Sequence, residues 1–149
     1  MTFVFDEGKP AMTTVQLLSP EGMAQPVPYH HVSIATGSRQ VHVAGQVGRD
    51  ADGKPVGDAD ELADQVAQAL RNTARGLAGA GASFADVVRL RFYVTDWTPE
   101  QMDDLMAGVA RVADELAIPQ PFPPSSLIGV EVLYAPDVRV EIEADAVLD

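Results

Sequence analysis

Hydrophobic and polar positions along the chain follow two different periods, which predict short strands and longer helices. Alternation with a period of two is typical of a strand that has one buried face. It marks residues 40–48, 86–96 and 137–147, and the β-branched and apolar content of residues 13–19, 30–36 and 125–133 predicts three further strands. Within residues 86–96, one predicted face is Val88, Leu90, Phe92 and Val94, and the other is Arg89, Arg91 and Tyr93. This strand is expected to bury its apolar face and to leave its arginines outside.

Two longer segments have apolar residues at every third or fourth position, which predicts amphipathic helices. One is residues 60–77, and the other begins after Thr98 and ends at Leu116. The apolar stripe of the second is Met102, Leu105, Met106, Val109, Val112 and Leu116. A turn at residues 37–38 predicts a hairpin between the second and third strands. The order βββαβαββ indicates an α+β protein with a mixed sheet and two helices on one face.

Composition narrows the classes of function. The length of 149 residues fits one domain, predicted as residues 13–149 after an extension of residues 1–12. The net charge of −12 argues against nucleic-acid binding, because such a chain repels phosphates. The pattern lacks a membrane span and a signal peptide, so no membrane partner is expected and the cytoplasm is the expected location. The chain has no cysteine, which excludes disulfides and thiolate metal sites.

Four short motifs resemble those of a known family. They are "VPYHHV", "VHVAGQVG", "DVVRLRFYVTDW" and "VRVEIEADAV", and together they extend from about Pro28 to Val147. On these motifs the chain is identified as a member of the Rid family, also called the YjgF or L-PSP family. The resemblance implies a chorismate-mutase-like α+β fold and a homotrimer with clefts between its subunits.

The resemblance also implies an activity, which is hydrolysis of reactive enamines and imines to keto acids and ammonia without a metal or other cofactor. The implied cleft contains Tyr29, Gly45 and Glu141. Glu141 is the candidate catalytic residue, because a carboxylate there can position or deprotonate the attacking water. Tyr29 and Gly45 are candidates for substrate binding, together with Gln46, Asp104, Ser126 and Leu127.

One position departs from the family pattern. Relatives have an arginine in a Phe-Pro-Ala-Arg segment, and the aligned "FPPSS" of this chain has Ser125 there. A guanidinium holds a carboxylate through two charge-assisted hydrogen bonds, whereas a hydroxyl offers one neutral bond, a deficit of roughly 2–5 kcal/mol. We therefore treat Ser125 as a catalytic-site position with altered specificity, and do not expect an ordinary imino acid as substrate. The sequence leaves open whether Arg91 or Arg139 supplies the cation instead.

Other chemistries find less support in the sequence. Ser125 and Ser126 do not lie in a Gly-x-Ser-x-Gly elbow, and a serine nucleophile needs a positioned base. His30 and His31 are adjacent in a predicted strand, so their side chains point to opposite faces and do not bind one ion together. With His42 as the third histidine, no metal site is expected.

Three functions are consistent with these observations. The leading one is enamine or imine hydrolysis, or related carbonyl chemistry, on a non-standard small molecule at an intersubunit cleft. The second is binding of a metabolite or partner protein by a catalytically inactive trimer. The third is a condensation or cyclisation step in a specialised pathway.

Overall fold

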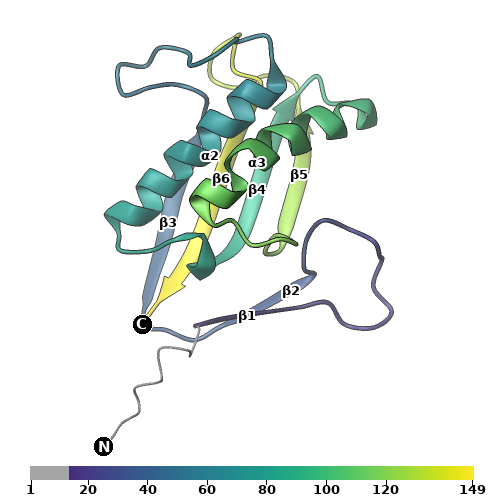
Figure 1. The fold of residues 1–149 in the computed structure, drawn as a ribbon, viewed down its shortest axis with the longest axis vertical. Coiled ribbons are helices and arrows are strands. Elements are labelled where there is room, and N and C mark those ends of the chain that lie inside the picture. Colours follow the sequence, from purple (N-terminus) through teal and green to yellow (C-terminus); the bar gives the residue numbers. More distant parts are fainter. Residues whose placement is uncertain (1–13) are drawn as a thin grey trace, which may run out of the picture.

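The computed structural model describes residues 14–149, so the predicted extension at residues 1–12 lies outside the described residues (Figure 1). The strands are β1 (Val15–Leu18), β2 (Val32–Ala35), β3 (Arg39–Gln46), β4 (Val87–Thr95), β5 (Ser125–Val130) and β6 (Val140–Leu148). The helices are α2 (Leu62–Gly79) and α3 (Met102–Leu116), with 3-10 turns at Phe84–Asp86 and Pro99–Gln101. The order of the elements is the predicted one. In this part of the chain, no helix has the length and apolar character needed to cross a membrane.

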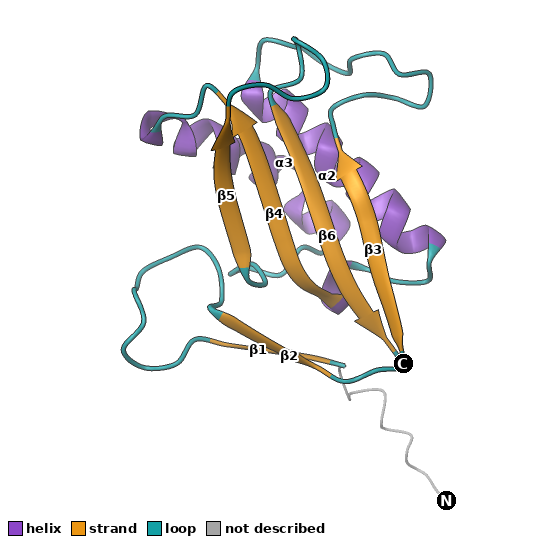
Figure 2. Ribbon diagram, turned by 180° about the vertical axis from the view of Figure 1, so that it is seen from behind, coloured by secondary structure: helices purple, strands orange, loops and turns teal. Residues whose placement is uncertain are grey.

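Four strands form a mixed sheet in the order β3-β6-β4-β5. β6 pairs antiparallel with β3 on one side and with β4 on the other, whereas β5 runs parallel to β4. A parallel pair needs a crossover connection, and α3 provides it between β4 and β5. β1 and β2 form a separate antiparallel pair beyond one end of the four strands (Figure 2).

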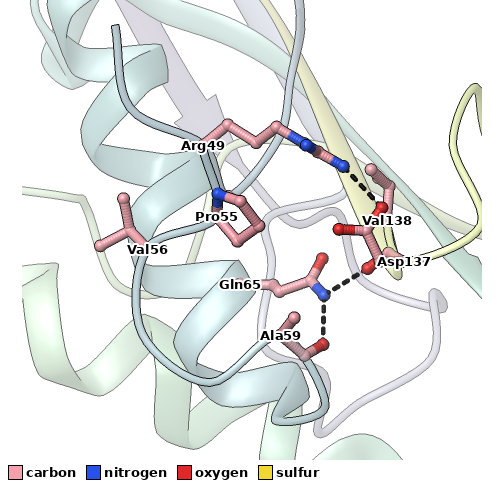
Figure 3. A pocket seen from close by; sticks show the side chains of 8 residues that line it. Arg49, Pro55, Val56, Ala59, Gln65, Asp137 and Val138 are labelled. Atoms are coloured by element: carbon pink, nitrogen blue, oxygen red, sulfur yellow. Dashed lines mark hydrogen bonds and ion pairs between the residues drawn. The ribbon is translucent and has the colours of Figure 1, made fainter. Parts of the chain in front are cut away.

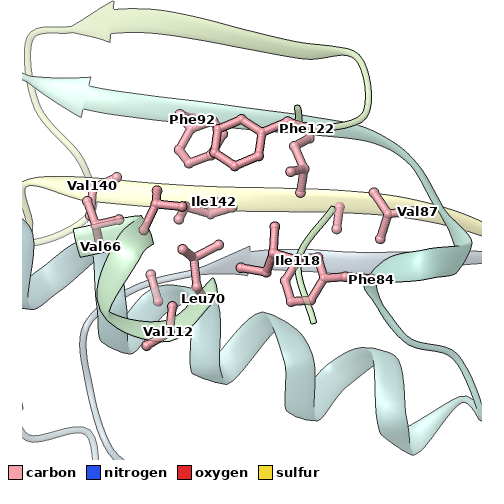
Figure 4. Packing of buried hydrophobic residues seen from close by; sticks show 14 of the residues in the cluster. Val66, Leu70, Phe84, Val87, Phe92, Val112, Ile118, Phe122, Val140 and Ile142 are labelled. Atoms are coloured by element: carbon pink, nitrogen blue, oxygen red, sulfur yellow. The ribbon is translucent and has the colours of Figure 1, made fainter. Parts of the chain in front are cut away.

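Both helices pack on one face of the mixed sheet, and the other face is open to the viewer in Figure 2. We call these the covered face and the open face. The core lies between the helices and the covered face, and includes Val66, Leu70, Val112, Phe92 and Ile142 (Figure 4). The helices approach each other closely at Gly108 of α3, where a Cβ would stand 2.6 Å from the carbonyl oxygen of Ala63. A larger residue at position 108 would therefore separate the helices.

The stripe predicted on the second helix is confirmed in its middle and differs at its start. Leu105, Val109 and Val112 are buried in the core. Met102, by contrast, is 39% exposed, at the first position of α3, where it lines a pocket together with Tyr29.

Two local predictions were wrong. The hairpin predicted at residues 37–38 does not form, because β2 pairs with β1 and β3 pairs with β6. Gly37, one of the two residues of the predicted turn, instead lets the chain pass close to the backbone of β6. In β4, a bulge between Val87 and Arg89 changes the register, so that Val87 rather than Val88 is buried. An extra residue in one strand shifts the alternation by one position, which a strict period of two does not foresee.

One buried amide joins two loops at the end of the sheet where β6 begins (Figure 3). Gln65 of α2 is 4% exposed, and its Nε2 donates to the carbonyl oxygens of Ala59 and Asp137 at 2.6 and 2.8 Å. Its Oε1 accepts from the backbone N–H of Arg139 at 2.8 Å. The Asp137 carboxylate also pairs with Arg49 at 2.6 Å. The loop before α2 and the segment before β6 are thus held by the same side chain.

Candidate functional site

The open face of the mixed sheet carries charged side chains from two neighbouring strands. The even-numbered residues of β6 face the core and are buried, whereas Glu141, Glu143 and Asp145 are half-buried on the open face. Arg91 and Tyr93 of β4 stand opposite Glu143 and Glu141 in the antiparallel register. Because these groups share one face, the contacts among them decide which carboxylate is available to a ligand.

A chain of hydrogen bonds and ion pairs engages two of the three acids. Tyr93 Oη donates to Glu143 at 2.9 Å. Arg91 Nη1 lies 3.6 Å from Glu143 and 3.0 Å from Asp145. His42 Nδ1 of β3 lies 2.8 Å from the other oxygen of Asp145. Glu143 and Asp145 are therefore committed to other side chains of the same face.

Two members of this network have shifted pKa values. The hydrogen bond to Glu143 raises the pKa of Tyr93, because loss of the phenol proton would bring two negative charges into contact. Burial acts in the same direction. Burial alone would raise the pKa of Asp145, but the hydrogen bonds from His42 and Arg91 outweigh it and leave this pKa lowered. Asp145 is thus an anion and Tyr93 a neutral phenol near neutral pH.

Glu141 differs from Glu143 and Asp145 in its contacts. Its carboxylate makes no hydrogen bond or ion pair with any residue between 14 and 149. The side chain lies over Gly45 of β3, where a Cβ would overlap Glu141 Oε2. An irregularity in the pairing between Val43 and Gln46 brings Gly45 to this position. A glycine is therefore needed beside this carboxylate, which is left free to act on a water or a ligand.

Gly45 and Gln46 also line an open groove that runs between the end of β3 and α2, next to Asn72 and Arg75. The Gln46 Nε2 donates to the carbonyl oxygen of Ala44 at 2.9 Å, so this side chain folds back on its own strand. The predicted residues Gly45, Gln46 and Glu141 are thus brought together at one place.

A second group of predicted residues lines a pocket of about 110 Å³ at the start of β5. The lining is Tyr29, Ser125, Ser126 and Leu127 with Pro28, Phe92, Met102, Leu105, Met106 and Phe122. Backbone hydrogen bonds hold Tyr29 against the proline-rich arm, since Phe122 donates to Pro28 at 2.8 Å and accepts from His30 at 2.7 Å. Most of the lining is apolar, which suits a small ligand with an apolar part.

Ser125 and Ser126 point to opposite sides of β5 and have different partners. Ser125 stands beside the buried Leu90, so it faces the helices, and its hydroxyl donates to the carbonyl oxygen of Pro123 at 2.8 Å. The Ser126 hydroxyl accepts from Nη2 of Arg89 at 2.7 Å. Neither hydroxyl contacts a base among the described residues, so the arrangement lacks what a serine nucleophile requires.

The sequence analysis missed Arg89 as a cation beside the serines. The two arginines that it considered lie elsewhere, because Arg91 belongs to the acidic network and Arg139 Nη2 donates to the carbonyl oxygen of Thr95 at 3.2 Å. The alternation of residues in β4 did place Arg89 outward. Only the parallel pairing of β4 with β5 brings it to Ser126, and the sequence does not specify that pairing.

The remaining candidates lie beside the pocket. Asp104 is exposed in the first turn of α3 and does not belong to the lining. The ring of His31 packs edge-on against Tyr29, with centroids 5.2 Å apart, and its Nε2 lies 2.8 Å from the carbonyl oxygen of Ala24. Within residues 14–149, no three histidine or carboxylate side chains gather as metal ligands would.

In one copy of the chain the two groups of residues lie on opposite faces of the sheet. Ser125 pairs with Leu90 and lies on the covered face, whereas Glu141 pairs with Tyr93 and lies on the open face. Alternate side chains of a pleated sheet do not reach around it to one ligand. A single copy therefore contains two half-sites, one around each of these residues.

Comparison with known proteins identifies the family to which this fold belongs. Residues 22–148 match the family model described as Endoribonuclease L-PSP. The chain belongs to this family, which is the Rid family that its motifs resemble. One relative is the RutC family protein YjgH of Escherichia coli. It is 34% identical over 103 residues, which are 68% of this chain and 72% of that protein.

Solved structures share the fold. The Rid family protein YyfB from Yersinia pestis superposes with a TM-score of 0.78 at 38% identity, covering 91% of this chain and 100% of that chain. TdcF of Escherichia coli, solved with bound serine, gives 0.63 at 26% identity and covers 88% and 94%. The predicted α+β fold is thus confirmed, and membership in this family supports a role that involves a small molecule.

Proposed function

We propose that the protein hydrolyses a small enamine or imine in a cleft between two copies, with Glu141 as its general base. The observation that carries this proposal is the unpartnered carboxylate of Glu141 beside Gly45, on a face where the other acids of β6 are engaged. A carboxylate without a partner is free to accept a proton from water, whereas one bound to arginine is a weaker base.

The two half-sites support an assembly of several copies. The Ser125 pocket and the Glu141 carboxylate act on one molecule only if a neighbouring copy supplies the half that is missing. The pocket of about 110 Å³ is also smaller than the 300–1,000 Å³ of usual ligand sites, as expected of a site that a neighbour completes. A homotrimer, the general assembly of this family, has one such cleft at each subunit boundary.

The reaction consumes one water and needs no oxidant or reductant. An enamine first gains a proton at carbon and loses one from nitrogen to solvent, which gives the imine. Glu141 then removes a proton from water while the water oxygen bonds to the carbon of the C=N group. That proton passes to the nitrogen and gives a carbinolamine. The proton of the new hydroxyl then passes to the nitrogen as the C–N bond breaks, so that ammonia leaves and a C=O group forms. The Tyr29 hydroxyl, at the pocket, is suited to hold a polar atom of the substrate.

The Ser125 hydroxyl supports a substrate unlike the usual one of the family. It is occupied by the carbonyl oxygen of Pro123, so it offers a ligand less than an arginine would. The structure of TdcF holds serine, a molecule of amino-acid size, which supports a ligand of similar size for this chain. The apolar lining around Leu127 favours a substrate with a small apolar side group.

The decisive experiment compares ammonia release by the wild type and by Glu141→Gln, using imines generated enzymatically from a panel of small amines and amino acids. We expect turnover of at least one imine by the wild type and a loss of about 100-fold or more in kcat for the variant. Glu115→Gln, a surface change on α3, is the matched control and should leave kcat unchanged. Equal rates for wild type and Glu141→Gln would refute the proposal.

A second candidate function is ligand binding without catalysis. It is favoured by the hydroxyl of Ser125, which is turned to its own backbone and supplies no charge to a reacting group. In that case the panel gives no ammonia above background, and Glu141→Gln leaves the affinity for a bound keto acid unchanged. Introducing the cation with Ser125→Arg separates the two functions further, because it should raise the rate with 2-aminoacrylate only if the base is already functional.

A further inference from the structure

The pocket at the start of β5 has a floor of core residues and a wall of two methionines. Phe92, Leu105 and Phe122 line it and are buried. Met102 and Met106 are four residues apart on α3, so their side chains lie on the same face of the helix, one above the other. Met106 is half-buried and Met102 is exposed, so the pair extends from the floor to the mouth of the pocket. A ligand can displace these flexible side chains without opening the core.

None of the residues that line this pocket is charged, and its hydroxyl groups offer little to an ionic ligand. The Ser125 hydroxyl donates to the carbonyl oxygen of Pro123 at 2.8 Å. The Ser126 hydroxyl belongs to the open face, where it accepts from Arg89. The hydroxyl of Tyr29 has no hydrogen-bond partner within residues 14–149. A charged group placed here would lose its hydration without gaining an opposite charge, whereas a hydrocarbon group would gain contacts.

We propose that the pocket receives an unbranched aliphatic group of the ligand, and that Met106 is the residue that sets the length of this group. Met102 covers the group at the mouth, and the Tyr29 hydroxyl binds the polar end of the ligand. A volume of about 110 Å³ holds about three to four methylene groups, since a methylene is similar in size to a water molecule of about 30 Å³. This inference rests on the proposed function, because it assigns the side group of the same substrate.

The test measures binding of neutral 2-oxo amides by titration calorimetry. The series is 2-oxopropanamide, 2-oxobutanamide, 2-oxopentanamide, 2-oxohexanamide and 2-oxooctanamide, which differ only in the length of an unbranched chain. We expect the affinity of the wild type to rise about three- to fourfold with each added methylene until the pocket is full, and to fall beyond that length. As a matched probe, 5-amino-4,5-dioxopentanoate carries a carboxylate where 2-oxopentanamide has its methyl group. It should bind at least about tenfold more weakly than 2-oxopentanamide.

Variants at the methionines distinguish a specific role from a structural one. Met106→Ala should move the optimum to chains longer by about one or two carbons, and Met106→Phe should move it to shorter chains, because these changes enlarge or fill the pocket. Met106→Leu conserves the volume and should keep the wild-type optimum. A change in stability alone would weaken all members of the series together without moving the optimum. Met23→Ala is the matched control, since Met23 is an exposed methionine outside the pocket lining.

Four results would overturn the inference. These are an affinity of the wild type that does not depend on chain length, absence of binding by any member, equal binding of the acid-ended probe, and the same optimum in Met106→Ala and Met106→Phe. A change in oligomeric mass with an unmoved optimum belongs to the last class, and would assign the pocket to a contact between copies.

The outcome is separable from that of the proposed reaction. A length optimum that follows residue 106 without any ammonia release refutes only the hydrolysis. Ammonia release that needs Glu141, in a protein whose binding is indifferent to chain length, refutes only this inference.

Discussion

The covered and open faces of the mixed sheet use the same strands for opposite purposes. On the covered face, Ile142 and its even-numbered neighbours in β6 are sealed under α2 and α3. On the open face, the odd-numbered acids of β6 are half-buried and bind one another through Arg91, except for Glu141. Within β6, the buried residues that stabilise the fold lie on one side and the candidate general base lies on the other, one residue apart.

This difference predicts that stability and ligand binding can be changed separately by mutation. Removing buried methyl groups leaves a cavity in a close-packed region, whereas a half-exposed charge that is removed is replaced by water. Substitutions in the core of the covered face, away from the β5 pocket, should therefore change the free energy of unfolding with little specific effect on ligand binding. Those on the open face should do the reverse.

The largest effect is expected from Leu70→Ala, at a residue that is 1% exposed under the sheet. The lost apolar contacts and the cavity should lower the free energy of unfolding by about 2–5 kcal/mol. Urea denaturation at fixed protein concentration measures it. Ile128→Ala on the open face, where Ile128 is 41% exposed, is the control and should cost well under half as much. Equal costs would mean that the open face is as closely packed as the covered one.

The next effect concerns the contact between the helices. In Gly108→Ala the new Cβ would stand 2.6 Å from the Ala63 oxygen and 2.8 Å from Val66 Cβ, so α2 and α3 must move apart. We expect a loss of about 1–3 kcal/mol in the same denaturation experiment. Gly79→Ala is the matched control, because nothing lies within 4 Å of its added Cβ and alanine favours the helix. A neutral Gly108→Ala would contradict the close approach.

A smaller effect is expected from Arg91→Gln on the open face. The change leaves Glu143 and Asp145 without their shared cation, and should lower the free energy of unfolding by about 1 kcal/mol. Added salt should reduce the difference from wild type, because it screens the repulsion between the two acids. Arg71→Gln, whose pair with Glu115 is 3.8 Å long, is the control and should cost almost nothing. No salt dependence would argue that the network is not electrostatic.

The smallest effect is expected in the pH dependence of stability, to which Asp145 contributes. Because folding lowers the pKa of this carboxyl below its ordinary value of 3.8, its contribution to stability is complete above that pH. The contribution is lost as the pH falls below 3.8 through the pKa of the folded state. We measure the free energy of unfolding of wild type and Asp145→Asn by denaturation between pH 6 and 2.5. The two curves of free energy against pH should converge as the pH falls. Parallel curves would contradict the lowered pKa.

The sequence predicted the fold well because the fold depends on local periodicity. The alternation in β6 and the stripe in α3 specify which face of each element is buried, and two helices between strands specify a layered α+β arrangement. Strand pairing was harder, since nothing in residues 30–36 distinguishes β1 from β3 as the partner of β2. The bulge at Val88 was invisible for a similar reason, because a partner strand defines it.

The candidate site was predicted in parts. The motifs located Gly45 and Glu141, and the structure explains the pair by the overlap that a Cβ would create. That Glu141, unlike Glu143 and Asp145, has no partner among residues 14–149 could not be predicted, because the contacts of those two acids cross from β6 to β4 and β3. The hydrogen bond from Arg89 to Ser126 was hidden likewise, since 37 positions separate the two residues along the chain.

The side chain of Gln65 has a consequence for how mutations act at this end of the molecule. One amide bonds to Ala59 before α2 and to Asp137 and Arg139 before β6, through three hydrogen bonds. A replacement at position 65 would therefore loosen two segments that are far apart along the chain in a single mutational step.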